Sequence, residues 1–177
     1  MGNRKIRDRG HDCLVTVDGT DFHVGGNNSK FHSHKFKKNA LRYEVCVCIQ
    51  TGDIVWINGP YEAGSWPDIN IFRDGLRHFL DENERVEADD GYIGDSPKYI
   101  KCPAGFTNIK ANERMQCFAR RRHETINKRF KNWKILSTIF RHDLRRHGDV
   151  FRAVVVITQL AINNGEKLFQ VKYDPFF

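Results

Sequence analysis

The stretch that decides the fold is Leu41-Arg42-Tyr43-Glu44-Val45-Cys46-Val47-Cys48-Ile49-Gln50. Every second residue from Leu41 to Ile49 is apolar, and this period of two predicts a β-strand with one apolar face. Thr51-Gly52-Asp53 then predicts a tight connection to a strand over residues 54–58. The β-branched run at residues 13–18 predicts an earlier strand, which we expect to end at a Gly19-Thr20 turn. The three runs together predict an antiparallel meander.

Helical and strand patterns alternate in the rest of the chain. After a loop at residues 25–38 and a break at Gly59-Pro60, the later elements are expected at 67–80 (helix), 85–89 and 99–102 (strands), 112–138 (helix) and 150–162 (helix). Ser65 and Asp68 have capping-box spacing, so Asp68 is expected to have a structural role at the start of the first helix. Asp149 is expected to cap the last helix, which is apolar nearly all round and therefore predicted to be buried.

Length and composition indicate one intracellular domain. A chain of 177 residues can bury a sizeable core without disulfides, and an odd number of cysteines, five, without a CxxC pair predicts reduced thiols. No apolar run of about 18 residues or signal-peptide pattern occurs, so no membrane association is expected. The net charge is +7 and unevenly spread: residues 50–100 carry 4 Lys/Arg against 11 Asp/Glu, and residues 110–147 carry 12 against 3. The basic part predicts a surface for a polyanion, with a solvated face as the alternative.

Three carboxylates occupy distinct settings. Asp18 lies in Val17-Asp18-Gly19-Thr20, Asp89 lies in Ala88-Asp89-Asp90-Gly91-Tyr92, and Glu124 lies within the long basic helix. Two divalent ions held by acids can hydrolyse a phosphodiester at neutral pH, and a donor set without Cys or His favours Mg²⁺ or Mn²⁺ over zinc. Two simpler interpretations remain open. The aspartates can be turn residues before glycine, and Glu124 can belong to an Arg120-Glu124-Lys128 surface ladder.

The blocks around these acids resemble the PIF/Harbinger-type DDE endonuclease domain over about residues 13 to 160. The resemblance rests on the two aspartate blocks, Ala40 to Val45, Asp68-Ile69-Asn70-Ile71-Phe72, and Glu124 with Lys131 and Trp133. It implies a ribonuclease H-like α/β fold with a mixed five-stranded sheet flanked by helices. It also implies Asp18, Asp89 and Glu124 as catalytic and metal-binding residues for two Mg²⁺ or Mn²⁺ ions, with Asp90 at a variable position.

The function that this resemblance implies is a nuclear DNA endonuclease and strand-transferase of a transposase. We expect residues 1–12 to be a basic lead, 13–165 the catalytic domain and 166–177 a tail. Members of the family have an amino-terminal helix-turn-helix-like region, for which this chain has no room, and a separate Myb-like DNA-binding partner. The sequence does not decide the oligomeric state, and a homo-oligomer is one of the alternatives.

Candidate DNA-contacting residues on and after the long helix are Arg120, Arg121, Lys128, Lys131 and Lys134. The alternatives are a non-catalytic DNA-binding scaffold and a ribonuclease acting on hybrids.

Overall fold

A mixed β-sheet forms the centre of the molecule in the computed structural model, which describes residues 13–82, 84–105 and 110–171. The strands are β1 (Cys13–His23), β2 (His32–Ser33), β3 (Lys38–Cys48), β4 (Ile54–Glu62), β5 (Arg85–Glu87) and β6 (Ile100–Lys101). They form a six-stranded sheet in the order β2-β3-β1-β5-β6, and β4 also pairs with β3. The described residues therefore form an α/β fold with six strands instead of the expected five, because β2 adds a two-residue strand.

The two halves of the sheet run differently. β1 pairs antiparallel with β3, and β3 pairs antiparallel with β4, which confirms the predicted meander. β5 is parallel to β1 and to β6. The β1–β5 pairing extends only to Thr16 opposite Glu87. Within the described ranges, the edge of β1 that faces away from β3 therefore has no strand beside it beyond Thr16, and the candidate site lies at this open edge.

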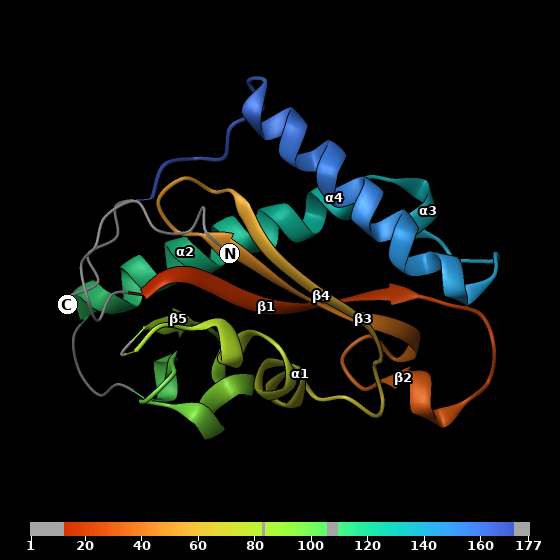
Figure 1. Cartoon of the computed structure of the whole chain (residues 1–177), viewed down its shortest axis with the longest axis horizontal. Coiled ribbons are helices and arrows are strands. Elements are labelled where there is room, and N and C mark those ends of the chain that lie inside the picture. Colours follow the sequence, from red (N-terminus) through yellow and green to blue (C-terminus); the bar gives the residue numbers. More distant parts are fainter. Residues whose placement is uncertain (1–12, 83, 106–109, 172–177) are drawn as a thin grey trace.

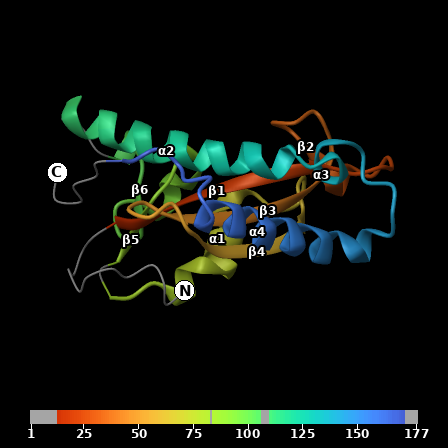
Figure 2. The same cartoon turned by 90° about the horizontal axis from the view of Figure 1, so that it is seen from above.

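Helices cover both faces of the sheet. They are α1 (Asp68–Asp74), α2 (Lys110–Lys131), α3 (Lys134–Ser137) and α4 (His147–Asn163). Figures 1 and 2 show α2 and α4 together on one side of the sheet and α1 on the other. One apolar core cluster joins Tyr43 and Val45 to Phe130 and Phe151, and a second joins Val15 and Val17 to Phe72. None of the helices in the described part is both long and apolar enough to span a bilayer.

Strand β1 is longer than its sequence predicted. It continues through Gly19 and Thr20 to His23, which pairs with Ala40, so the predicted turn at Gly19-Thr20 was wrong. Likewise β4 runs through Gly59-Pro60 to Glu62, and its pairing with β3 shifts register between Arg42 and Glu44 to accommodate them. In both places β3 supplies a long template, so the pairing outweighs the local preference for a turn.

Each predicted helix differs from the expectation at its ends. The helix over 67–80 divides at Gly75 into α1 and a short 3-10 helix, Leu76–Phe79. The predicted capping box was wrong: Pro67 is the N-cap without a side-chain bond, and Ser65 Oγ donates to the Lys30 carbonyl and Glu62 instead. The helix expected over 112–138 ends at Lys131, and α3 forms a separate short turn.

The last helix and the segment after it also correct the prediction. Arg146 precedes α4 without a side-chain cap, and Asp149 lies exposed in its first turn, where it pairs with Arg152. The helix is not buried all round, because Val156, Ile157 and Leu160 face outward and are 58%, 44% and 53% exposed. Leu168, expected to lie in a tail, is buried in the first core cluster.

Candidate functional site

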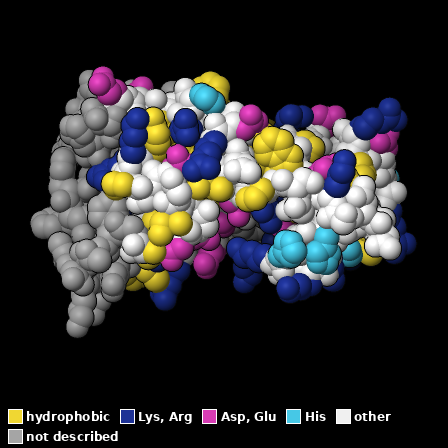
Figure 3. Space-filling view, turned by 90° about the horizontal axis from the view of Figure 1, so that it is seen from below, with side chains coloured by type: hydrophobic (Ala, Val, Ile, Leu, Met, Phe, Trp, Pro, Cys, Tyr) yellow, Lys and Arg dark blue, Asp and Glu magenta, His cyan; other side chains and the backbone are white. Residues whose placement is uncertain are grey.

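Two neighbouring cavities lie at the open edge of β1. The larger has a volume of about 380 Å³ and the smaller about 130 Å³, and Asp18, Lys35 and Glu124 line both. Figure 3 shows a hollow on one face of the molecule, with acidic side chains along one side of it and Lys, Arg and His side chains along the other. The shared residues make the two cavities parts of one site.

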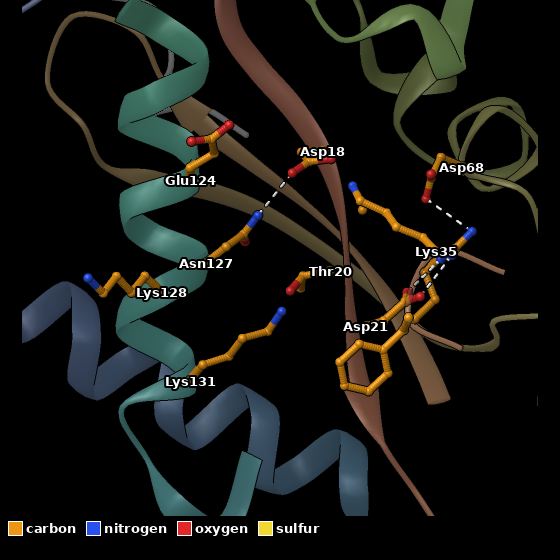
Figure 4. A pocket seen from close by; sticks show the side chains of 12 residues that line it. Asp18, Thr20, Asp21, Lys35, Asp68, Glu124, Asn127, Lys128 and Lys131 are labelled. Atoms are coloured by element: carbon orange, nitrogen blue, oxygen red, sulfur yellow. Dashed lines mark hydrogen bonds and ion pairs between the residues drawn. The ribbon is translucent and has the colours of Figure 1, made fainter. Parts of the chain in front are cut away.

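The three acids singled out in the sequence all line the smaller cavity. Asp18 belongs to β1, Asp89 directly follows β5, and Glu124 lies in α2. Figure 4 shows the Asp18 and Glu124 side chains projecting into the space between β1 and α2. In the described part of the chain, however, no three His, Cys, Asp or Glu side chains form a group that could hold a metal ion. The fold gathers the acids around one cavity without forming a closed ligand cluster.

Asp18 has an electrostatic environment that disfavours its charge. The pKa of the Asp18 carboxyl is raised to about 7, mainly by burial and in smaller part by the nearby Asp89 and Asp68 carboxylates. The Lys35 ammonium group and the Gly19 backbone N–H oppose this shift of the pKa. In Figure 4 the Lys35 side chain extends toward Asp18 from the turn between β2 and β3. A cation close to the Asp18 carboxyl would favour its ionised form and lower its pKa.

Asp89 and its neighbour Asp90 have separate roles. The Asp89 Oδ1 atom accepts a hydrogen bond of 2.9 Å from the Gly91 N–H at the start of a 3-10 helix, so the turn interpretation holds for that oxygen. The Asp90 Oδ1 atom accepts from the Ala104 N–H at 2.9 Å and lines neither cavity. Asp89 therefore remains the candidate at this position, and Asp90 holds the following loop.

Glu124 is exposed on the side of α2 that faces the cavities. Among the described residues, no ion pair joins Glu124 to Arg120 or to Lys128. The surface-ladder interpretation therefore has no contact to support it. Glu124 is available to a ligand that enters either cavity.

Helix α2 is fixed against β1 by two side-chain hydrogen bonds. Thr16 Oγ1 and His123 Nδ1 are 2.8 Å apart, and Asn127 Nδ2 donates to Asp18 Oδ2 over 3.0 Å. Four residues advance about 6 Å along a helix, and two residues advance about 6.7 Å along a strand. Because these two lengths nearly match, both hydrogen bonds can form at the same time. Burial lowers the pKa of His123 to about 3, so this ring is neutral. The two bonded residues of α2 lie before and after Glu124 in the helix, so the bonds fix Glu124 on the same cavity as Asp18.

Asn127 and His123 were not predicted from the sequence as residues of the site. The signal that could have found them is the match of two spacings. Positions 123 and 127 are four apart on a helix, and positions 16 and 18 are two apart on a strand. Without knowing that this helix packs on this strand, the match has no meaning, and only the structure supplies that packing.

The basic residues predicted to contact DNA divide into two groups. Arg120 lines the smaller cavity, and Lys128 and Lys131 line the larger one. Arg121 and Lys134 are exposed and line neither. Burial lowers the pKa of Lys131, and the Asp21 and Asp18 carboxylates oppose this effect. Lys35 was not predicted, because its loop has no periodic pattern that would place it.

Asp68 faces the larger cavity instead of capping α1. Its Oδ1 atom lies 3.4 Å from Arg42 Nη1, and Arg42 Nε also bonds Asp21 Oδ1 at 2.7 Å. Burial raises the pKa of Asp68, while the Arg42 guanidinium group lowers it. Gly19 makes this placement possible, since a Cβ atom at position 19 would collide with the Asp68 carboxylate.

Gly19→Ala is therefore expected to destabilise the protein by about 1–3 kcal/mol, the usual cost of an overpacked contact. Asp68→Ala in the same chain should recover most of this loss, because it removes the carboxylate that the new methyl group meets. Urea unfolding of the two single variants and the double variant measures the coupling. Strictly additive effects would show that the two positions do not compete for space.

The comparisons with known proteins gave no relative: no family model, no curated protein and no solved structure matched this chain.

Proposed function

We propose that the chain is a metal-dependent DNA endonuclease and strand-transferase of the PIF/Harbinger DDE type, with a ribonuclease H-like fold. The observation that carries the proposal is that Asp18, Asp89 and Glu124, from three separate elements, line one cavity. The mixed sheet, with helices on both faces and the first acid on a central strand, is consistent with that fold.

The donor set fits a hard divalent ion such as Mg²⁺ or Mn²⁺. Asp18, Asp89 and Glu124 would hold two ions, since oxygen donors are the ligands that these metals prefer. The raised pKa of Asp18 supports this assignment, because burial beside other carboxylates leaves the ionised form short of positive charge. When bound, the ions would supply an activated water and neutralise charge on the attacking and leaving oxygens of a phosphodiester.

The residues around the acids would position the substrate. Asn127 donates a hydrogen bond to Asp18 Oδ2 and would so fix the orientation of this carboxylate toward a ligand. Lys35 and Arg120 line the same cavity and would contact the scissile phosphate. Cleavage would leave a 3′ hydroxyl group, which the same site would direct to a phosphate of the target strand.

The exposed cations on and after the long basic helix would extend the contact with DNA. Arg121 and Lys128 on α2, and Lys134 on α3, are exposed, and each phosphate contact adds affinity without base specificity. Recognition of a particular DNA sequence would come from another element or from a Myb-like partner. The proposal assigns the protein to the nucleus, where this substrate lies.

The test is nicking of supercoiled plasmid by the purified chain with Mg²⁺ or Mn²⁺. We expect nicked circles that appear only with metal and disappear in chelator. An RNA–DNA hybrid incubated in parallel separates a DNA endonuclease from a ribonuclease. Binding of plasmid without nicking in either metal would contradict the proposal.

A second candidate function is a non-catalytic DNA-binding scaffold. Two observations favour it: no three of the described acids, histidines or cysteines form a metal-holding group, and one Asp89 oxygen is already engaged by Gly91. A scaffold would bind DNA equally well in chelator and in Mg²⁺. The nicking assay and a binding assay in both conditions therefore separate the two candidates.

A further inference from the structure

The larger cavity has the size and lining of a small-molecule pocket. Its volume of about 380 Å³ falls within the range of about 300–1,000 Å³ typical of ligand sites. It opens beside the open edge of β1 and is bounded by α2, by the turn that carries Lys35 and Phe36, and by Asp68 at the start of α1. A DNA duplex is too wide to enter a pocket of this size, whereas one nucleotide is not.

Unsatisfied polar groups line this cavity. Thr20 Oγ1 and Asn127 Oδ1 are buried atoms without a hydrogen-bond partner, and both residues belong to its wall. Thr20 is only 2% exposed. Buried polar atoms in native proteins are nearly always bonded, so each orphan calls for an explanation. A polar ligand in the cavity provides one.

The charged and aromatic residues of the wall suit a nucleotide. Lys35, Lys128 and Lys131 can neutralise a phosphate, and Figure 4 shows Lys131 reaching from α2 toward Thr20. Phe36 also lines this cavity and is 37% exposed, which leaves part of its ring free for a base to stack on. Phe36 does not line the smaller cavity, whereas its neighbour Lys35 lines both.

From this arrangement we propose that the larger cavity binds a single unpaired nucleotide, the one attached to the phosphate that the proposed metal site would cleave. The inference rests on the proposed function for the identity of that phosphate. The phosphate lies at the rim shared by the two cavities, beside Lys35, and the base enters the larger cavity against Phe36. A paired base must leave its stack to bind there, so single-stranded or frayed DNA is preferred over a closed duplex.

The probe for this subsite is deoxyadenosine 5′-monophosphate, titrated in Mg²⁺ and followed by NMR chemical shifts of the protein. We expect saturable binding that perturbs residues 35–36 and 127–131. Phe36→Ala should weaken it about five- to fiftyfold through loss of base stacking. The matched control is Phe118→Ala, which removes an exposed phenylalanine on α2 that lines neither cavity.

Two comparisons complete the test. Inorganic phosphate should bind more weakly than the nucleotide and should not distinguish wild type from Phe36→Ala, since it carries no base. An oligonucleotide should bind more tightly as a single strand than in a duplex, and Phe36→Ala should reduce that difference. Equal binding of nucleotide by wild type and Phe36→Ala, or equal binding of phosphate and nucleotide, would overturn the inference.

This result is separable from the fate of the proposed function. Phe36 lines the larger cavity and not the smaller one, whereas Asp89 lines the smaller cavity and not the larger one. A protein that nicks plasmid but fails the nucleotide test disproves the subsite alone. A protein that binds the nucleotide in a Phe36-dependent way but never nicks DNA disproves the endonuclease alone, and the pocket stands as a nucleotide site.

Discussion

Asp89→Asn and Glu124→Gln should each reduce metal-dependent plasmid nicking by about a hundred- to thousandfold, while DNA binding in chelator stays within about twofold of wild type. Loss of one metal ligand removes several kcal/mol of charge stabilisation from the transition state, and each 1.36 kcal/mol is a factor of about ten in rate. Both acids line the smaller cavity with Asp18. Nicked and supercoiled plasmid, separated on a gel over time, give the rates.

The matched control for this pair is Asp90→Asn. Asp90 adjoins Asp89, carries the same charge and lines neither cavity, since its carboxylate holds the Ala104 N–H. Its replacement should retain most of the nicking rate, because an asparagine oxygen can still accept that bond. If Asp90→Asn were inactive and Asp89→Asn active, the second acid of the proposed triad would be assigned to the wrong residue.

The sequence predicted the sheet well where its pattern was strong. The period of two in residues 41–50 gave β3, and the short connection at residues 51–53 gave its antiparallel pairing with β4. The ends of elements were less accurate. Gly19 was predicted to terminate β1, yet it lies within the strand, paired with Glu44 of β3, and the Asp68 carboxylate fills the space where a Cβ would lie. That contact joins positions far apart in the chain, so local pattern could not show it.

The candidate site was predicted in part. The three acids were chosen from their settings, and they line one cavity. Lys35, Asn127 and Asp68 were missed or assigned elsewhere, although all three line the larger cavity. Their roles depend on where the β2–β3 turn, α2 and α1 meet the open edge of β1. That meeting is a consequence of tertiary packing, which periodicity along one element does not encode.

Asp18→Asn should make the metal-free protein more stable at pH 8 by about 2–4 kcal/mol and should have almost no effect at pH 4. In the folded chain the pKa of Asp18 is about 7, mainly because of burial, whereas an unfolded aspartate has a pKa of about 3.9. Well below pH 4 both states are protonated, and at pH 4 the unfolded carboxyl is only about half ionised, so the difference in stability is still small. As the pH rises from 4 to 7 the unfolded chain ionises first, so the wild type loses stability until the folded carboxyl also ionises.

The comparison with the variant isolates this one group. Asp68 and Glu44 also have raised pKa values, that of Glu44 being about 8 because of burial, but both acids are present in both chains. Urea unfolding between pH 4 and pH 8 measures the difference in free energy. Asp143→Asn is the control of opposite sign, because hydrogen bonds from Arg145 lower the pKa of that exposed aspartate.

Added Mg²⁺ extends the same measurement to the proposed metal site. A ligand that binds only the folded state stabilises it, so at pH 8 Mg²⁺ should raise the stability of the wild type. The same ion should have little effect on Asp18→Asn, which lacks the charge that holds it. With saturating metal the order of the two stabilities at pH 8 should therefore approach equality or reverse. An equal response of both proteins to Mg²⁺ would remove Asp18 from the metal site and would leave its raised pKa as a consequence of burial alone.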